Sequence, residues 1–415
     1  PQIRSLGGAI LVMTLVLYPY VYLLSRAAFL SQSTCLLDVS RTLGRGPWRH
    51  FAEVAVPMAR PAIVGGVALA LMETMADFGT VQYFGINTFT TGIYRTWFAL
   101  GEPIAAAQLA AILMIFVFAM LWIERQSRAN ARYDHTTAMR PLTSYKLTGG
   151  RRALAFVACL IPIVLGFLVP VLALIQMTWE QGDVLMAGKF IPLAWNSLTL
   201  AGLAACLTVT LAVLVAYGVR LRPSLPMRLA SSVASLGYAI PGTVIAVGVL
   251  IPFARMDNAL NGWLQAQFGV SVGLVLSGTI IGLLFAYLVR FLAVAMNNVE
   301  SGFGKINRHL DDAARSLGHR PGGTLVRVHL PLLRGALLTA GMIVFVDVLK
   351  ELPATLIMRP FNFETLAVRV YTFASDERLA EASTAALAIV AVGLIPVIVL
   401  SRAIARSRPR QGRLS

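Results

Sequence analysis

Long apolar runs dominate the chain, and short polar segments separate them. Nine runs have the length of about 20 residues that a helix needs to cross a hydrocarbon core about 30 Å thick. They fall at roughly 6–24, 60–80, 104–123, 153–178, 195–218, 229–253, 272–296, 332–352 and 382–401. Because the runs are rich in Leu, Val, Ala and Ile and the loops between them are short, they predict helices rather than barrel strands. The pattern therefore predicts an all-α, polytopic transmembrane helical bundle.

One polar segment occurs twice between these runs. Residues 36–57 read LLDVSRTLGRGPWRHFAEVAVP, and residues 310–331 read LDDAARSLGHRPGGTLVRVHLP. A constant offset of 274 residues aligns Asp38, Arg41, Leu43, Gly44 and Pro57 with Asp312, Arg315, Leu317, Gly318 and Pro331. Chance similarity between apolar segments does not align Gly, Pro and charged residues at fixed spacing. The sequence therefore predicts two repeats that share one orientation.

The repeat also predicts the domain organisation. Three predicted spans (153–178, 195–218 and 229–253) precede the second copy, and nothing corresponding precedes the first. We expect a parent of twelve helices in two six-helix halves, of which this chain lacks the first three. Its expected parts are the last three helices of the first half (1–124), a basic linker (125–152), a complete second half (153–402) and a basic tail (403–415).

The charge is unevenly distributed along the chain. Apolar residues make up 57% of the sequence and charged residues 13%, yet the net charge is +16. Most Lys and Arg fall in the linker, the tail and the other segments on one side of the predicted spans, which is the positive-inside bias. The basicity thus orients the chain, with both polar segments, the linker and the tail in the cytoplasm. It does not indicate a nucleic-acid partner.

The second polar segment has the pattern of two short helices. Leu310, Ala313, Ala314 and Leu317 recur at the spacing of one helix face. Gly318 suits the left-handed position that ends a helix, and a proline three residues later can open another. One such segment could be a surface connector only. Two matched copies indicate twin docking elements for a two-fold partner, because a short amphipathic helix can insert into a groove.

The residues in these segments carry a family resemblance. Asp312-Ala313-Ala314, Gly318 and Pro331 resemble the EAA loop of binding-protein-dependent ABC importer permeases. The first copy has Asp38-Val39-Ser40 in place of the Glu-Ala-Ala core, with the Gly and Pro spacing intact. Segments 72–101 and 350–383 resemble the fused two-half ferric-iron permeases.

The resemblance implies partners and a location. The EAA loops would dock a cytoplasmic ABC ATPase dimer, and a periplasmic or lipoprotein binding protein would deliver the solute at a bacterial inner membrane. The sequence has no Gly-x-x-x-x-Gly-Lys-Ser/Thr phosphate loop, so we expect no enzyme activity and no bound cofactor, with ATP used by the partner subunit. Related fused permeases are associated with thiamine, phosphonates or polyamines, so these solutes are alternative cargoes.

Charged residues near the ends of two spans are candidates for the translocation pathway. Glu73 and Asp77 align with Asp347 and Glu351, and Lys350 follows Asp347 by three. Counting about 24–30 Å of helix from Pro57 places Glu73 and Asp77 near the outer end. They could line the path, with Glu73 the first choice, or form an interfacial ion-pair cluster such as Asp347 with Lys350. We expect Arg290 to be structural and to snorkel to the inner end of its span.

Two other function classes are less consistent with the sequence. A proton-coupled secondary carrier could use Glu73, Asp77 and Glu351 as a relay, but it does not explain the twin loops. A membrane enzyme has less support, because no clustered nucleophile or acid–base pair stands out. The three Cys are scattered, and the five His all fall in inside segments, so we expect no metal site.

Overall fold

A computed structural model describes residues 3–30, 32, 38–40, 42–129, 147–181 and 190–407. In this part of the chain, nine helices are long and apolar enough to cross a membrane, which confirms the expected helical bundle. The chain divides into two compact units, residues 1–92 with 108–173 (unit 1) and residues 93–107 with 174–415 (unit 2). Arg41, most of the linker and the end of the tail lie outside the described residues.

The helix boundaries reproduce the predicted repeat. Helix α1 (Leu6–Leu30) corresponds to α13 (Ile280–Gly304) at both ends when the offset of 274 is applied. The series α3 (Pro47–His50), η1 (Phe51–Ala55) and α4 (Val56–Ala76) corresponds to α15 (Pro321–Thr324), η5 (Leu325–His329) and α16 (Leu330–Leu349). Helix α1 packs on α4 as α13 packs on α16. The two copies therefore share local structure as well as sequence.

Each copy contains a π-helical turn, η1 or η5, directly before its long helix. Pro57 and Pro331 stand at the start of α4 and α16. A proline has no N–H to donate, and its ring crowds the carbonyl four residues earlier. A wider π turn relieves this conflict without ending the helix. The backbone of Val56 accordingly donates to the carbonyl of Phe51, and that of Leu330 to Leu325.

The other helices of the first half of the chain follow in sequence order. They are α5 (Gly79–Tyr83), α6 (Phe89–Phe98), α7 (Pro103–Ala129), α8 (Gly150–Ile163), the π-helical η2 (Val164–Leu168) and α9 (Val169–Gln181). In unit 1, a Cβ on Gly66 of α4 would lie 2.7 Å from the Cα of Val21 of α1. Glycine is therefore required for α1 and α4 to cross this closely.

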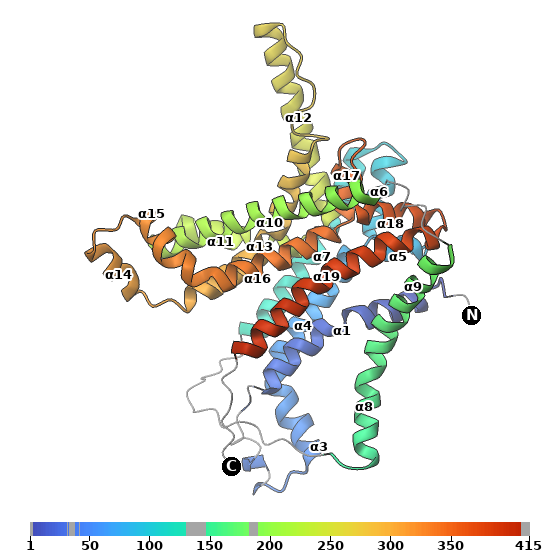
Figure 1. The fold of residues 1–415 in the computed structure, drawn as a ribbon, viewed down its shortest axis with the longest axis vertical. Helices are drawn as coiled ribbons and strands as arrows, with labels where there is room; N and C mark the ends of the chain where they lie inside the picture. Colours follow the sequence, from blue (N-terminus) through green and yellow to red (C-terminus); the bar gives the residue numbers. More distant parts are fainter. Residues whose placement is uncertain are drawn as a thin grey trace. The chain divides into compact units, whose positions relative to one another are not determined.

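Unit 2 is built around three helices that pack on one another, α10 (Phe190–Leu221), α13 and α16. Small buried residues such as Ala204, Ala295 and Ala340 line their contacts. Helices α14 (His309–Ser316) and α15 lie at one end of α16, and α17 (Pro353–Met358) and α18 (Leu366–Ser375) lie at the other end (Figure 1). The remaining elements are α11 (Leu225–Ala234), the 3-10 turn η4 (Gly237–Ala239), α12 (Gly242–Phe268) and α19 (Leu379–Ser407).

Two of the predicted spans have wrong boundaries. The run at 229–253 is broken between α11 and α12, because Pro241 precedes α12 and Gly237 lies against the backbone of α13, where a Cβ would be 1.8 Å from the Val289 carbonyl oxygen. The run at 272–296 begins as a helix only at Ile280. Asp257 of α12 accepts the backbone N–H groups of residues 275, 276 and 277, which holds that segment out of helical conformation.

Candidate functional site

The second polar segment folds as the predicted pair of helices, α14 and α15. Gly318 has φ +78°, and the N–H of His319 donates to the carbonyl of Ala314 across the turn. This is the left-handed helix end that glycine favours. Of the predicted docking residues, Ala314 is buried, whereas Asp312, Ala313, Arg315 and Leu317 are exposed. The helix face predicted from the spacing is thus divided between the interior and the surface.

The first polar segment repeats this turn with different chemistry. Gly44 has φ +74°, and Asp38 and Leu43 are exposed. Ser40 takes the aligned place of Ala314 and is buried, and its hydroxyl lies 2.6 Å from Nδ1 of His50. A hydrogen bond therefore replaces the small apolar contact at the position where the first copy departs from the Ala-Ala pair.

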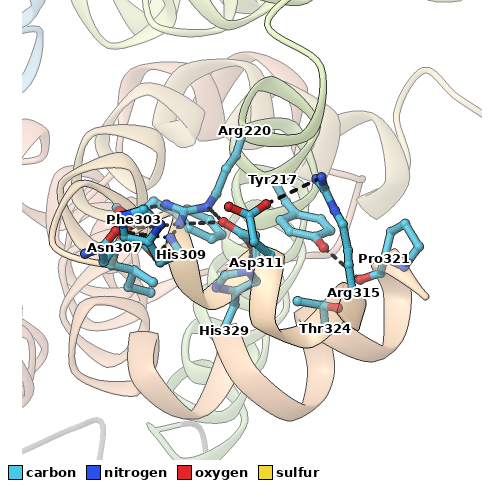
Figure 2. A network of polar contacts seen from close by, with 12 residues as sticks. Tyr217, Arg220, Phe303, Asn307, His309, Asp311, Arg315, Pro321, Thr324 and His329 are labelled. Atoms are coloured by element: carbon cyan, nitrogen blue, oxygen red, sulfur yellow. Dashed lines mark hydrogen bonds and ion pairs between the residues drawn. The ribbon is translucent and has the colours of Figure 1, made fainter. Parts of the chain in front are cut away.

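A buried polar network holds α14 to the rest of unit 2. Arg220, near the C-terminal end of α10, donates from Nε (2.9 Å) and Nη2 (2.7 Å) to Oδ2 of Asp311. His329 of η5 places Nε2 2.6 Å from Oδ1 of the same carboxylate. Figure 2 shows Asp311 between these two side chains. One carboxylate thus joins α14 to η5 and to α10, which is 91 positions away along the chain.

The end of α10 makes further contacts with the turns around α14. Arg220 donates to the carbonyls of Phe303 (3.0 Å) and Ile306 (3.1 Å), just before α14. The hydroxyl of Tyr217 donates to the carbonyl of Pro321 (2.7 Å), the first residue of α15. These bonds connect α10 to the chain just before α14 and to the start of α15.

The network keeps Asp311 charged. Burial acts to raise the pKa of this carboxyl, but the hydrogen bonds from Arg220 and His329 outweigh it, and the pKa lies below its usual range. Asp311 is therefore an anion at neutral pH. Charge-assisted bonds of this kind are stronger than neutral ones.

Sequence reasoning did not identify this network. The motif falls on the neighbour of Asp311, Asp312, which is exposed, and Arg220 stands at the end of a predicted span, where a basic residue is ordinary. The sequence signal that could have revealed the network is a second acidic residue, Asp311, followed eighteen positions later by a histidine, His329, in the apolar stretch before Pro331.

Large apolar side chains are exposed on and near α14. Leu310 on α14 is 41% exposed, Leu317 at its C-terminal cap is 77% exposed, and Val326 of η5 is 61% exposed. In the first copy, Leu43 (71%) and Trp48 (84%) are exposed in the same way. Each copy therefore presents large apolar side chains on a short helical segment. In unit 2, the hydrogen bonds of Asp311 hold that segment to α10 and η5.

Two of the four candidate pathway carboxylates, Asp77 and Glu351, accept hydrogen bonds at helix starts. Asp77 accepts the N–H of Val81 (3.0 Å) and the hydroxyl of Thr80 (3.0 Å), at the start of α5. Glu351, its aligned counterpart, accepts the N–H of Ala354 (3.0 Å), at the start of α17. The long helices α4 and α16 have already ended at this point, so each carboxylate stabilises a break in its repeat.

The other charges have different surroundings. Lys350 Nζ lies 3.1 Å from Oδ1 of Asp347, as in the ion-pair alternative. Glu73 is half-buried on α4. The expected snorkelling of Arg290 is wrong: this residue is buried, and its Nη1 lies 3.2 Å from Oε1 of Glu351. Arg290 is about 15 Å along α13 from its first residue, so this contact places the Glu351 carboxylate beside the interior of that helix.

Within the described residues, no group of three or more His, Cys, Asp or Glu side chains is arranged to hold a metal ion. The most distinctive feature of the chain is thus the pair of matched segments at 38–57 and 309–331 rather than a catalytic or metal centre.

Comparison with known proteins decides the family. The family model described as "Binding-protein-dependent transport system inner membrane component" matches residues 4–132 and 208–411, which include both polar segments. The chain belongs to this family. It is therefore a multi-pass inner-membrane protein and a permease subunit of the ABC transporter type, as the resemblance of the two loops implied.

Several members of this family are similar over much of the chain. An Fe(3+)-transport system permease protein, FbpB 2, of Haemophilus influenzae is 28% identical over 97% of this chain and 77% of its own length. The ferric transport system permease protein FbpB of Actinobacillus pleuropneumoniae is 23% identical over 84% of this chain, which spans about half (51%) of that relative. A putative 2-aminoethylphosphonate transport system permease protein, PhnV, of Salmonella typhimurium is 27% identical over 45% of this chain.

Proposed function

We propose that this permease is the transmembrane part of an ATP-driven importer of ferric iron. The observation that carries the proposal is the pair of matched helical segments, each with exposed apolar side chains, one of which is tied through Asp311 to a long membrane helix. A surface of this kind suits a partner that pushes on the membrane helices. The proposal includes the orientation in which both segments, the linker and the C-terminus face the cytoplasm.

The partner that pushes would be a dimeric ABC ATPase. Two repeats of one orientation offer two equivalent docking segments, which suits a two-fold partner. The chain would bind no cofactor itself, and ATP would be bound and hydrolysed by the partner. Closure of that dimer would move α14 and the first-copy segment, and α10 would carry the movement into unit 2.

A substrate-binding protein would deliver the cargo on the opposite side of the membrane. The family description names dependence on such a protein, which supports a periplasmic or lipoprotein partner. Reciprocal coupling then requires that delivery outside changes ATP hydrolysis inside.

The choice of ferric iron follows the relatives with the widest coverage. The Haemophilus relative named for Fe(3+) transport aligns with 97% of this chain, whereas the phosphonate relative aligns with 45%. Phosphonate, thiamine and polyamine remain alternative cargoes. A proton-coupled carrier has less support, because two of its proposed relay groups, Asp77 and Glu351, accept hydrogen bonds at helix starts.

The contribution of Glu73 to the pathway is a separate part of the proposal. Its position on α4, half-buried and one turn before the cap residue Asp77, suits a pathway contact. We expect Glu73→Gln to lower uptake at equal expression and equal ATPase assembly. Unchanged uptake would remove Glu73 from the path, together with any proton relay that uses it.

Reconstitution tests the proposed function. The full-length permease, its ATPase and its binding protein would be placed in proteoliposomes, and uptake of radioactive Fe³⁺ would be measured with and without ATP. Leu317→Asp should release the ATPase and abolish uptake. Leu225→Asp, which changes an equally exposed leucine (71% against 77%) on α11, is the matched control and should retain the ATPase. Uptake that persists without ATP and follows a proton gradient would contradict the proposal.

A further inference from the structure

The buried pair of Arg290 and Glu351 has no equivalent in the first repeat. Both side chains are more than 90% buried, and Nη1 of Arg290 lies 3.2 Å from Oε1 of Glu351. The aligned position of Arg290 is Val16, while Asp77 occupies that of Glu351. A charge inside a span is expensive and is a functional candidate by default. Replacing a buried ion pair with apolar residues is often neutral for stability, so stability alone does not explain the pair.

Two breaks in the helices of unit 2 meet at this pair. One separates α11 from α12, and a Cβ on Gly242, the first residue of α12, would lie 2.2 Å from Nη1 of Arg290 and 2.5 Å from Oε1 of Glu351. The other separates α16 from α17, where Glu351 caps the shorter helix. Interrupted helices at membrane depth are the usual setting of solute sites in transporters, because their ends present unpaired backbone groups.

Residues close in sequence to Gly242 and Glu351, or hydrogen-bonded to such a residue, carry further oxygen atoms. The hydroxyl of Tyr287 lies 2.5 Å from Oγ1 of Thr355, one turn after Glu351. The hydroxyl of Thr243, next to Gly242, is buried and has no hydrogen-bond partner among the described residues. Carboxylate, phenol and hydroxyl oxygens are hard ligands of the kind that hard cations prefer.

Arg290 is weakly bound for a buried guanidinium. It can donate five hydrogen bonds, yet its Nε is buried without a hydrogen-bond partner in the described structure, and its bond to Glu351 is long for an ion pair. An arginine that only stabilised the fold would be expected to satisfy more of these donors.

We propose that Glu351 is a contact for a cationic cargo inside unit 2, and that Arg290 is the built-in cation that occupies this carboxylate while the site is empty. The cargo class is a hard multivalent cation or a small complex of one, which rests on the proposed function. An arriving cation takes the place of the guanidinium at Glu351, so the charge of the carboxylate stays compensated. Displacement of Arg290 removes its contact with Glu351 at the start of α17. The presence of cargo is thereby coupled to movement at the two helix breaks.

Uptake by the reconstituted complex tests this inference. The double variant Arg290→Met, Glu351→Met removes both charges together and so leaves no buried charge unpaired. We expect it to assemble with the ATPase and to keep the stimulation of ATP hydrolysis by the binding protein, but to lose at least tenfold in the rate of radioactive Fe³⁺ uptake. Glu351→Gln, whose amide oxygen can still accept the Ala354 N–H, should lose uptake to a similar degree.

Asp376→Asn is the control, because it neutralises an exposed carboxylate of the same unit that has no part in the proposed site. It should keep most of the uptake. Wild-type uptake by the double variant, or by the exchanged pair Arg290→Glu, Glu351→Arg, would show that the pair is structural and would overturn the inference. Failure of the proposed function is distinguishable, since the wild-type complex would then show no ATP-dependent Fe³⁺ uptake.

Discussion

Nε2 of His329 lies 2.6 Å from Oδ1 of Asp311, and the other carboxylate oxygen, Oδ2, is bound by Arg220. This relationship connects the exposed helix α14 to the π turn before α16 and to the end of α10. Because the three side chains are largely buried, the helix pair is a fixed part of unit 2 and not a loose loop. The proposed coupling of a partner's movement to the membrane helices depends on this rigidity.

Removal of Arg220 should loosen α14. Arg220→Ala deletes the bonds to Asp311 and to three backbone carbonyls, and hydrogen bonds to charged groups contribute about 1.5–3 kcal/mol each. We expect faster amide hydrogen exchange in α14 by at least tenfold and less ATPase bound. Arg222→Ala, which changes an exposed arginine two residues later, should change neither. Unaltered exchange in the Arg220 variant would mean that the network does not hold the helix.

The depressed pKa of Asp311 predicts a pH dependence. Because the pKa of the folded state lies below the ordinary value of 3.8, the charged carboxylate contributes stability that is fully present above about pH 4 and is lost as the pH falls through the lowered pKa. Wild type should therefore exceed Asp311→Asn in thermal stability by a constant margin from pH 7 to pH 4, and the margin should shrink below that. A margin that disappears near pH 6 would contradict this assignment.

The turn after α14 should require glycine. Gly318 has φ +78°, a conformation that costs a residue with a Cβ about 1–2 kcal/mol. Gly318→Ala should lower the stability of the helix pair by about that amount, and Gly318→Asn by less. Gly322→Ala is the matched control, since Gly322 has no positive φ and open space around its Cβ position. Equal effects of the two alanine variants on thermal unfolding would refute the strain argument.

Asp257 should anchor the segment before α13. It is 1% exposed and accepts three backbone N–H groups and the Ser277 hydroxyl (2.6 Å). Asp257→Asn replaces an anionic acceptor with a neutral amide, which should cost roughly 2 kcal/mol. Hydrogen exchange at residues 275–277 should rise, while Asn258→Ala, at an exposed neighbouring position, leaves it unchanged. Intact protection in the Asp257 variant would show that the chain holds this segment by other contacts.

The repeat made much of the fold predictable. The matched Gly and Pro residues of the two segments gave the helix pair and its turn, because a left-handed glycine and a helix-opening proline act locally. The break before α12 was missed, because Gly237 and Pro241 stand in an apolar run whose composition continues without interruption. Its cause is a close contact with α13, which only the folded chain reveals.

The side-chain pairs of the site were the least predictable part. Arg220 and Asp311 are 91 positions apart, and Arg290 and Glu351 are 61 apart. Their meeting depends on how α10, α13 and α16 cross, and helical periodicity gives no register between distant helices. Helix α16 ends at Leu349 and the short helix α17 follows at Pro353, so counting residues along one continuous helix does not give the position of Glu351.

Crosslinking tests the central claim most directly, namely that the exposed faces of the two matched segments contact a separate ATPase. A photo-reactive amino acid would be placed at Leu317 and, in a second variant, at Phe361, which is 94% exposed beyond the opposite end of α16. The complex would be irradiated in membranes and its products identified by mass spectrometry. We predict crosslinks to the ATPase from position 317 and none from 361. ATPase crosslinks from 361 with none from 317 would contradict the account.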